Sequence, residues 1–248
     1  MKTSNPAFAN NTYTVNAVAA GYGPTMTISG TVNKAGILML LVMATAAYAW
    51  NQFFTNGPQA IGGLTMIGAF GGMIAAFVTI FKKEWSPITA PIYALLEGLF
   101  LGSLSAMFEM RFPGIAIESV ALTFGTCFAM LLAYRSGLIR PTQKFMLGVV
   151  AATGGIALVY FLSMILSFFH VQVPGIFGSG PVGILFSLAV VVVAALNLIL
   201  DFSFIEEGAY RGAPKYMEWY SAFGLMVTLV WLYMEILRLL SKLRDDRR

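Results

Sequence analysis

The acidic side chains inside long apolar runs are the residues of this sequence best suited to chemistry. Asp201 interrupts an apolar run that begins near Val182, and Asn197 precedes it by four residues, which puts both on one helix face. A carboxylate inside a membrane helix costs about 2.5–3.5 kcal/mol on insertion scales, so it faces protein or water rather than lipid. The pattern indicates an ion or proton path, with Asp201 near one mouth as a gating residue and a candidate calcium ligand.

A second acid, Glu97, lies near the middle of the apolar stretch Y-A-L-L-E-G-L-F-L-G. A carboxylate at that depth is costly to ionise unless water or a partner reaches it. Glu97 could therefore be a proton-linked switch or a cation ligand, and the alternative is a protonated acid hydrogen-bonded to a neighbouring helix. Glu218 opens the segment after the Asp201 helix and is another candidate pathway residue. Glu235 precedes Arg238 by three residues, which predicts a local ion pair.

The stretch from Glu206 to Arg211 spells E-E-x-x-x-R, which matches the first motif of CAAX-type intramembrane proteases. In those proteases the glutamate activates water with help from histidines on other helices. This sequence has one histidine, His170, and no second histidine motif. It therefore lacks the set of histidines that would help a glutamate to activate water for hydrolysis. The single Cys127 excludes a cysteine-based metal site and indicates an inert core thiol. We therefore expect no enzyme and no cofactor, and a solvated helix end at the E-E-x-x-x-R stretch.

The composition places these acids in a membrane protein. The chain has 248 residues, of which 58% are hydrophobic and 10% are charged, whereas about 25% charged residues is normal for a soluble domain. Its net charge of +4 comes mostly from loops and the C-terminal tail. That distribution is typical of membrane proteins and is no sign of nucleic-acid binding, so the lipid bilayer is the first partner that the sequence predicts.

Seven hydrophobic segments are each close to the ~20 residues needed to cross a bilayer. They are Ala35–Trp50, Gln59–Phe81, Ile88–Phe108, Gly114–Tyr134, Phe145–Phe169, Val182–Ile205 and Tyr216–Leu240. Short loops should make neighbouring helices antiparallel. We expect an all-α integral membrane protein with one seven-helix domain over residues 35–240, a disordered polar tail over 1–34 and a basic tail over 241–248.

Basic residues predict the orientation of the chain in the membrane. With a cytoplasmic N-terminus, nine lysines and arginines fall in or beside inner loops, and Arg111 is the only one in an outer loop. Seven spans would then put the basic C-terminal tail outside, against the same rule. If the last segment were a re-entrant hairpin, or if one span were miscounted, the C-terminal tail would lie inside. The sequence therefore does not decide on which side of the membrane the C-terminus lies.

Several stretches together resemble a known family. They are L-I-L-D-F-S-F-I-E-E-G at Leu198–Gly208, W-L-Y-M-E-I-L-R-L-L at Trp231–Leu240, A-L-L-E-G-L-F-L-G at Ala94–Gly102 and Y-R-S-G at Tyr134–Gly137. Over Ala35–Leu240 the chain resembles the transmembrane Bax inhibitor motif (Bax inhibitor-1-like) family in its bacterial branch. The resemblance implies a seven-helix bundle with the last helix central, a bacterial inner-membrane location and a pH-sensitive calcium leak.

In that family, two aspartates on the sixth and seventh helices share a proton and close the pore. Such a pair titrates as a unit because two close carboxylates cannot both stay ionised. Asp201 matches the aspartate of the sixth helix. The place of the other falls near Val227 and Thr228, where this sequence has no acid. Asp201 could pair instead with Glu97, with Glu218 or with the hydroxyl of Thr228.

Two functions follow from these patterns. The first is a cation pathway through the bundle, for calcium and sensitive to protons, with Asp201 near its gate. The second is a non-transporting regulator that binds other membrane proteins, such as a quality-control protease. Gly68 and Gly72 stand four residues apart in the second segment, a spacing that allows close helix contact. That segment and the polar N-terminal tail would suit partner docking.

Overall fold

Helices supply the regular structure in the part of the chain that the computed structural model describes, residues 24–169 and 175–246. No strand occurs within those two ranges. Seven helical segments there are long and apolar enough to cross a membrane, from Ile28–Asn56 to Met217–Asp246. The predicted all-α membrane protein with seven spans is therefore confirmed.

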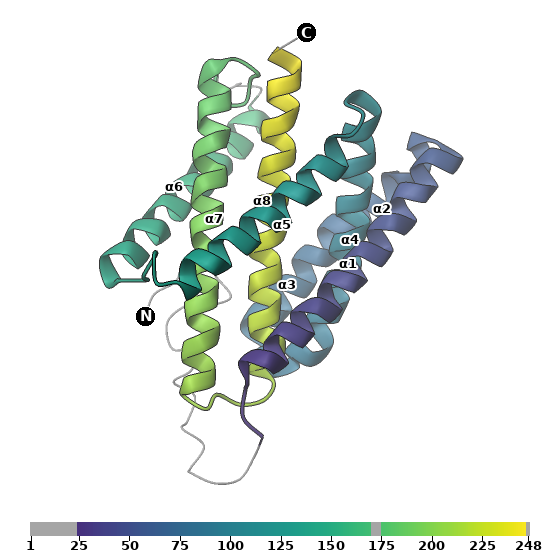
Figure 1. Ribbon diagram of the computed structural model, residues 1–248. Coiled ribbons are helices and arrows are strands. Elements are labelled where there is room, and N and C mark those ends of the chain that lie inside the picture. The colour runs from purple at the N-terminus through teal and green to yellow at the C-terminus, as the bar shows by residue number, and fades with distance from the viewer. Residues whose placement is uncertain (1–23, 170–174, 247–248) are drawn as a thin grey trace. The chain divides into compact units, whose positions relative to one another are not determined.

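Six of the seven spans are built mainly from one long helix each (Figure 1). These helices are α1 (Ile28–Asn56), α4 (Ser86–Arg111), α5 (Ile115–Arg135), α6 (Gln143–Phe168), α7 (Pro181–Tyr210) and α8 (Met217–Asp246). The second span is composite. It consists of η2 (Pro58–Ile61), α2 (Gly62–Met66), the π-helical segment η3 (Ile67–Gly71) and α3 (Gly72–Phe81), and the short η4 (Lys83–Trp85) follows it.

The helices extend beyond the apolar segments that the sequence predicts. α1 begins at Ile28 rather than Ala35, where the Thr27 side chain caps it by accepting a hydrogen bond from the amide of Gly30. α8 continues to Asp246 rather than ending at Leu240, so the first residues of the predicted basic tail are helical. Hydropathy marks the part of a helix that contacts hydrocarbon, and polar turns can continue the helix on either side.

The described residues divide into two compact units. One unit contains residues 117–202 and 228–246, and the other contains residues 24–116 and 203–227. The chain passes from one unit to the other near the start of α5, within α7 and again within α8. We refer to them as the Asp201 unit and the Glu218 unit, after the buried acid in each.

In the Glu218 unit, α4 packs against α1 on one side and the second span on the other. Glycines allow both approaches, because a Cβ atom on Gly98 or Gly102 would overlap the backbone of α1. On the other side, a Cβ on Gly68 would lie 2.7 Å from the carbonyl oxygen of Leu96. The close helix contact that the Gly68–Gly72 spacing predicts is thus made with α4, inside this chain.

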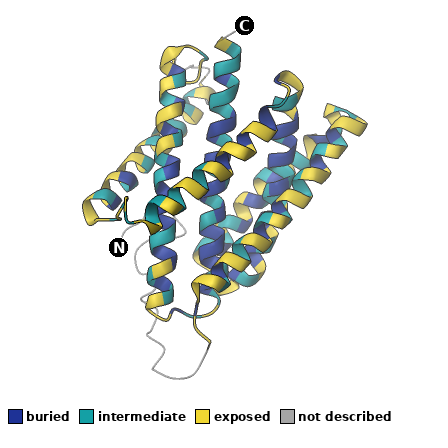
Figure 2. Ribbon diagram, viewed as in Figure 1, coloured by how far each residue is buried: buried dark blue, intermediate teal, exposed yellow. Residues whose placement is uncertain are grey.

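In the Asp201 unit, α6 packs on α7 through Met146, Val149 and Leu200. Large apolar side chains remain exposed in this unit and in the other. Figure 2 shows exposed positions along α6 and α1. They include Leu158, Phe161 and Leu162 on α6, and Leu40 and Met43 on α1. Apolar surface of this kind is what lipid tails cover in a membrane protein.

Candidate functional site

Asp201 is fully buried within α7, with no exposed surface. Asn197 lies one turn earlier and is 3% exposed. Its amide nitrogen donates hydrogen bonds of 2.8 Å to the hydroxyl of Thr153 on α6 and of 2.8 Å to the carbonyl oxygen of Val193. The two bonds hold the amide in one orientation, so α7 presents a fixed polar side chain one turn from the carboxyl group.

Asp201 and the two residues that flank it, Leu200 and Phe202, face other helices of the same unit. Cys127 on α5 is close enough for the two side chains to interact electrostatically. The ring of Tyr134, also on α5, lies 5.9 Å from that of Phe202, and Leu200 packs against α6. A carboxyl group in such surroundings is costly unless a proton or a cation neutralises it.

The remaining candidate residues fall in both units. Thr228, on α8, belongs to the Asp201 unit with Asn197 and is 3% exposed. Glu97 and Glu218 belong to the other unit. Of the alternative partners that the sequence suggests for Asp201, Thr228 is therefore the one that lies in the same unit.

Glu97 is partly buried on α4, beside the second span. Its carboxyl group accepts a hydrogen bond from the phenol of Tyr93, one turn earlier on the same helix. A Cβ on Gly72 would lie 3.2 Å from its Oε2, so the absence of a side chain there makes room for the acid. The Tyr93 ring in turn packs edge-on against Phe223 at 5.0 Å. This hydrogen bond is made within α4, and the roles of Glu97 that the sequence suggests stay predictions.

Glu218 is fully buried in the first turn of α8 and is held by three residues. Its Oε1 accepts hydrogen bonds from the amide (2.9 Å) and hydroxyl (2.8 Å) of Thr27 and from Lys215 (2.7 Å). Its Oε2 pairs with Lys34 at 2.5 Å. A side chain on Gly30 would overlap the carboxyl group. These contacts tie the start of α1 to α8 and favour a structural role for Glu218, while its pathway role stays a prediction.

The loop before Glu218 is held by the same part of the unit. The amide of Met26 donates a hydrogen bond of 2.7 Å to the carbonyl oxygen of Ala213. The hydroxyl of Ser86 donates one of 3.0 Å to the carbonyl oxygen of Tyr216. Burial, together with the negative charge of Glu84, raises the pKa of the Tyr216 phenol above its usual range. The loop between α7 and α8 is therefore anchored to both α1 and α4.

A second group of buried charges lies on α8 in the Asp201 unit. Glu235 is 2% exposed and pairs with Arg238 at 3.1 Å, as the sequence predicts, and the hydroxyl of Tyr160 also donates to it. Lys242 is 5% exposed, although it falls in the predicted basic tail. Its ammonium group donates to Ser187 at 2.8 Å and to two backbone carbonyl oxygens at 3.0 Å. Glu235, Arg238 and Lys242 are spaced along one helix face. That spacing could have indicated from the sequence that Lys242 belongs to the helix and not to a tail.

The E-E-x-x-x-R stretch forms the last turns of α7. Glu207 pairs with Arg211, four residues later, and Glu206 is exposed. Within residues 24–169 and 175–246, no three histidine, cysteine, aspartate or glutamate side chains are grouped so that they could hold a metal ion. His170 lies outside the described residues.

The comparison with protein families decides the affiliation of the chain. A family model described as Bax inhibitor 1 like matches residues 5–245, nearly the whole sequence. The chain belongs to the Bax inhibitor 1 like family. No curated protein and no solved structure matches it at a significant level. Family membership and seven apolar helices together identify a multi-pass membrane protein of this family.

Proposed function

We propose that the protein conducts cations, calcium foremost, along a proton-sensitive path controlled by Asp201. The observation that carries the proposal is the complete burial of this acid within a 30-residue apolar helix. Ionisable groups at such positions are costly and by default mark ion or proton pathways. Membership in the Bax inhibitor 1 like family supports the same activity, because the resemblance implies a pH-sensitive calcium leak.

The proposed mechanism rests on the two ways of neutralising a buried carboxylate. When Asp201 holds a proton, it carries no charge that could attract a cation. Loss of the proton leaves a negative charge that a calcium ion can balance, so flux rises as the pH rises. Asn197, fixed by Thr153, supplies a polar group one turn along α7, and Thr228 supplies a hydroxyl on α8.

The departure from the family pattern affects the expected pH dependence. Val227 and Thr228 stand near the place where the resemblance implies a second aspartate, and neither side chain titrates in the physiological range. Flux should therefore follow the protonation of one group rather than of a coupled pair. A titration curve with the steepness of a single site is the signature of this proposal.

The test is calcium flux into proteoliposomes from about pH 6 to 8, the range that brackets perturbed carboxylates. We expect flux in the wild type to rise with pH and Asp201→Asn to abolish the rise. Glu206→Gln, which removes an exposed acid from the same helix, is the matched control and should behave as the wild type. Absence of cation flux at every pH, in protein shown to be folded, would refute the proposal.

The alternative is a non-transporting regulator that binds other membrane proteins. The glycines of the second span lend it less support than the sequence suggests, because Gly68 and Gly72 already contact α4. It would gain if Asp201→Asn left a cellular phenotype intact while deletion of residues 1–23 removed it. Neither alternative involves catalysis.

We also propose a bacterial inner-membrane location with a cytoplasmic N-terminus. The bias of basic residues toward the loops on one side supports this orientation. Single cysteines placed at residues 57 and 82, in a Cys127→Ser background, should differ in labelling by a membrane-impermeant thiol reagent. Labelling of residue 82 but not of residue 57 from outside the cell would contradict it.

A further inference from the structure

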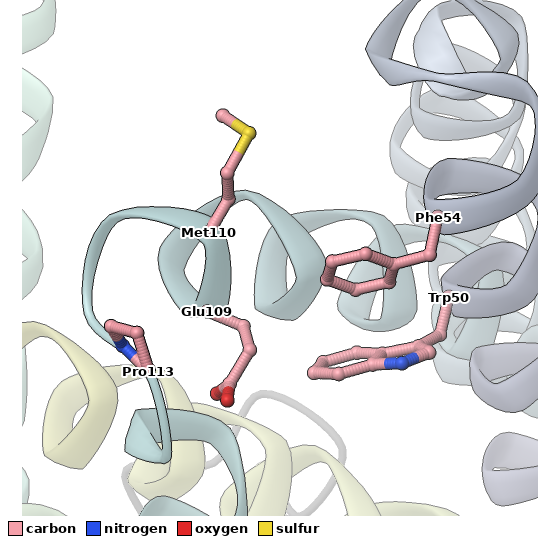
Figure 3. Close-up of a pocket in the computed structure, with 5 residues that line it drawn as sticks. All are labelled: Trp50, Phe54, Glu109, Met110 and Pro113. Atoms are coloured by element: carbon pink, nitrogen blue, oxygen red, sulfur yellow. The ribbon is translucent and has the colours of Figure 1, made fainter.

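We propose that a cleft at the ends of α1 and α4 binds an organic ammonium ion. The cleft has a volume of about 520 Å³ and belongs entirely to the Glu218 unit. Its lining residues, drawn in Figure 3, are Trp50, Phe54, Glu109, Met110 and Pro113. The volume falls in the range of about 300–1,000 Å³ that is common for small-molecule sites.

Two aromatic rings form one wall of the cleft. Trp50 and Phe54 lie one turn apart on α1, with ring centroids 5.1 Å apart and ring planes inclined by 46°. Figure 3 shows both rings reaching from α1 toward the end of α4. Phe54 is 53% exposed, so its ring is accessible to a ligand. Faces of aromatic rings attract a cation within about 6 Å, and indole does so most strongly.

A carboxylate in a fixed orientation stands opposite the rings. Glu109 accepts hydrogen bonds from the amides of Gly114 at 2.5 Å and Ala116 at 3.0 Å, which hold it at the start of α5. An ionised carboxyl group has about four acceptor positions, so two bonds leave capacity for a ligand. Across the two described ranges, no basic side chain forms an ion pair with Glu109. Its negative charge is therefore available to balance a bound cation.

The composition of the lining selects the class of cation. A calcium or magnesium ion needs six or more oxygen ligands, including water, and is poorly served by one carboxylate among apolar groups. The rings, Met110 and Pro113 suit the methyl or methylene groups of an alkylated ammonium ion, and Glu109 suits its charge. The cleft lies where two membrane-length helices end, at Asn56 and Arg111. The ammonium group could thus come from a zwitterionic lipid headgroup or from a free organic cation.

The test uses the full-length protein in a non-ionic detergent, titrated with choline. Binding is followed by tryptophan fluorescence and by calorimetry, and 3,3-dimethylbutanol serves as the uncharged isostere of choline. We expect saturable binding of choline and none of the isostere at the same concentrations. Trp50→Phe should remove most of the fluorescence change and retain the calorimetric signal, which assigns the signal to this ring.

Matched variants separate the charge from the shape of the cleft. Glu109→Gln keeps the size of the side chain and should weaken choline binding about tenfold or more. Phe54→Leu leaves the carboxylate in place and should also weaken binding. Glu84→Gln, an exposed acid just before α4, should bind as the wild type. Equal binding of choline and its isostere, or wild-type binding by both cleft variants, would overturn the proposal.

Lipid nanodiscs distinguish the two sources of the ligand. In discs of anionic lipid alone, the protein should bind free choline. If added phosphatidylethanolamine or phosphatidylcholine weakens that binding in the wild type, the lipid headgroup is the ligand, and if it does not, the ligand is a free cation. The result does not depend on the proposed ion path, because Asp201 lies in the other unit.

Discussion

Asp201 and Glu218 are both fully buried acids, and they lie in opposite settings. Glu218 stands in the first turn of α8, where two lysines and a threonine hold both of its oxygens. Asp201 stands within α7, one turn from Asn197 and close to Cys127 on α5. Burial alone therefore does not identify a functional acid. We infer that its lysine partners make Glu218 part of the scaffold, and we propose that its place deep in an apolar helix makes Asp201 responsive to protons and cations.

The largest expected effect on stability is that of Glu218→Ala. The substitution leaves Lys34 and Lys215 without their shared partner and frees the start of α1. We expect a loss of about 3 kcal/mol in the free energy of unfolding. This is at the low end of the cost of breaking a fully buried ion pair, because the two lysines are partly exposed. Denaturant unfolding in detergent measures it. A change below about 0.5 kcal/mol, the usual size of a surface effect, would show that the contacts are not structural.

Gly30→Ala tests the same region without removing any charge. The new Cβ would overlap the carboxyl group of Glu218 and push it from its position between Thr27 and Lys34. Such overpacking costs about 1–3 kcal/mol. The control is Gly36→Ala on the same helix, since a Cβ at Gly36 meets nothing within 4 Å. Equal melting temperatures for the two variants would contradict the tight fit around Glu218.

In the Asp201 unit, Lys242→Met tests the buried ammonium group near the end of α8. The variant keeps the length of the side chain but leaves Ser187 and two carbonyl oxygens without their donor. We expect a loss of about 1–2 kcal/mol in the free energy of unfolding. Lys144→Met, at an exposed position, is the control. If both variants unfold alike, the three hydrogen bonds contribute nothing measurable.

The smallest effect on stability is expected at Asn197. Asn197→Ala removes the hydrogen bond to Thr153 and should cost about 1 kcal/mol. Its effect on flux should be larger, because the fixed polar group beside Asp201 is lost. Thr153→Val provides the comparison, since it removes this hydrogen bond and keeps the Asn197 side chain. Wild-type flux in Asn197→Ala would remove this residue from the proposed path.

The sequence supports the membrane class, the seven spans and the family, because each rests on hydropathy or local motifs that one segment carries. The ion pair of Glu235 with Arg238 could likewise be predicted, because its partners are three residues apart. The partners of Glu218 could not. Thr27 lies 191 positions away in the sequence, in a stretch whose polar composition suggests a disordered tail.

Other differences have the same physical origin. Lys242 resembles a residue of a basic tail until α8 is seen to continue past it, and its acceptors come from α7 and the loop before it. In the sequence, Glu109 is one of several acids at the ends of apolar segments, where water can solvate them. Only the packing of α1 beside α4 places it opposite Trp50 and Phe54. Local patterns predict elements, whereas sites assembled from distant elements need the fold.

The central claim, that Asp201 and not Glu218 controls a proton-sensitive path, is tested most directly by one comparison. Calcium flux is measured in proteoliposomes across about pH 6 to 8 for the wild type, Asp201→Asn and Glu218→Gln, with melting temperatures recorded for each. We predict that Asp201→Asn keeps its stability and loses the pH-dependent flux, while Glu218→Gln melts at a lower temperature and retains it. Retention of pH-dependent flux by Asp201→Asn together with its loss in folded Glu218→Gln would contradict the claim.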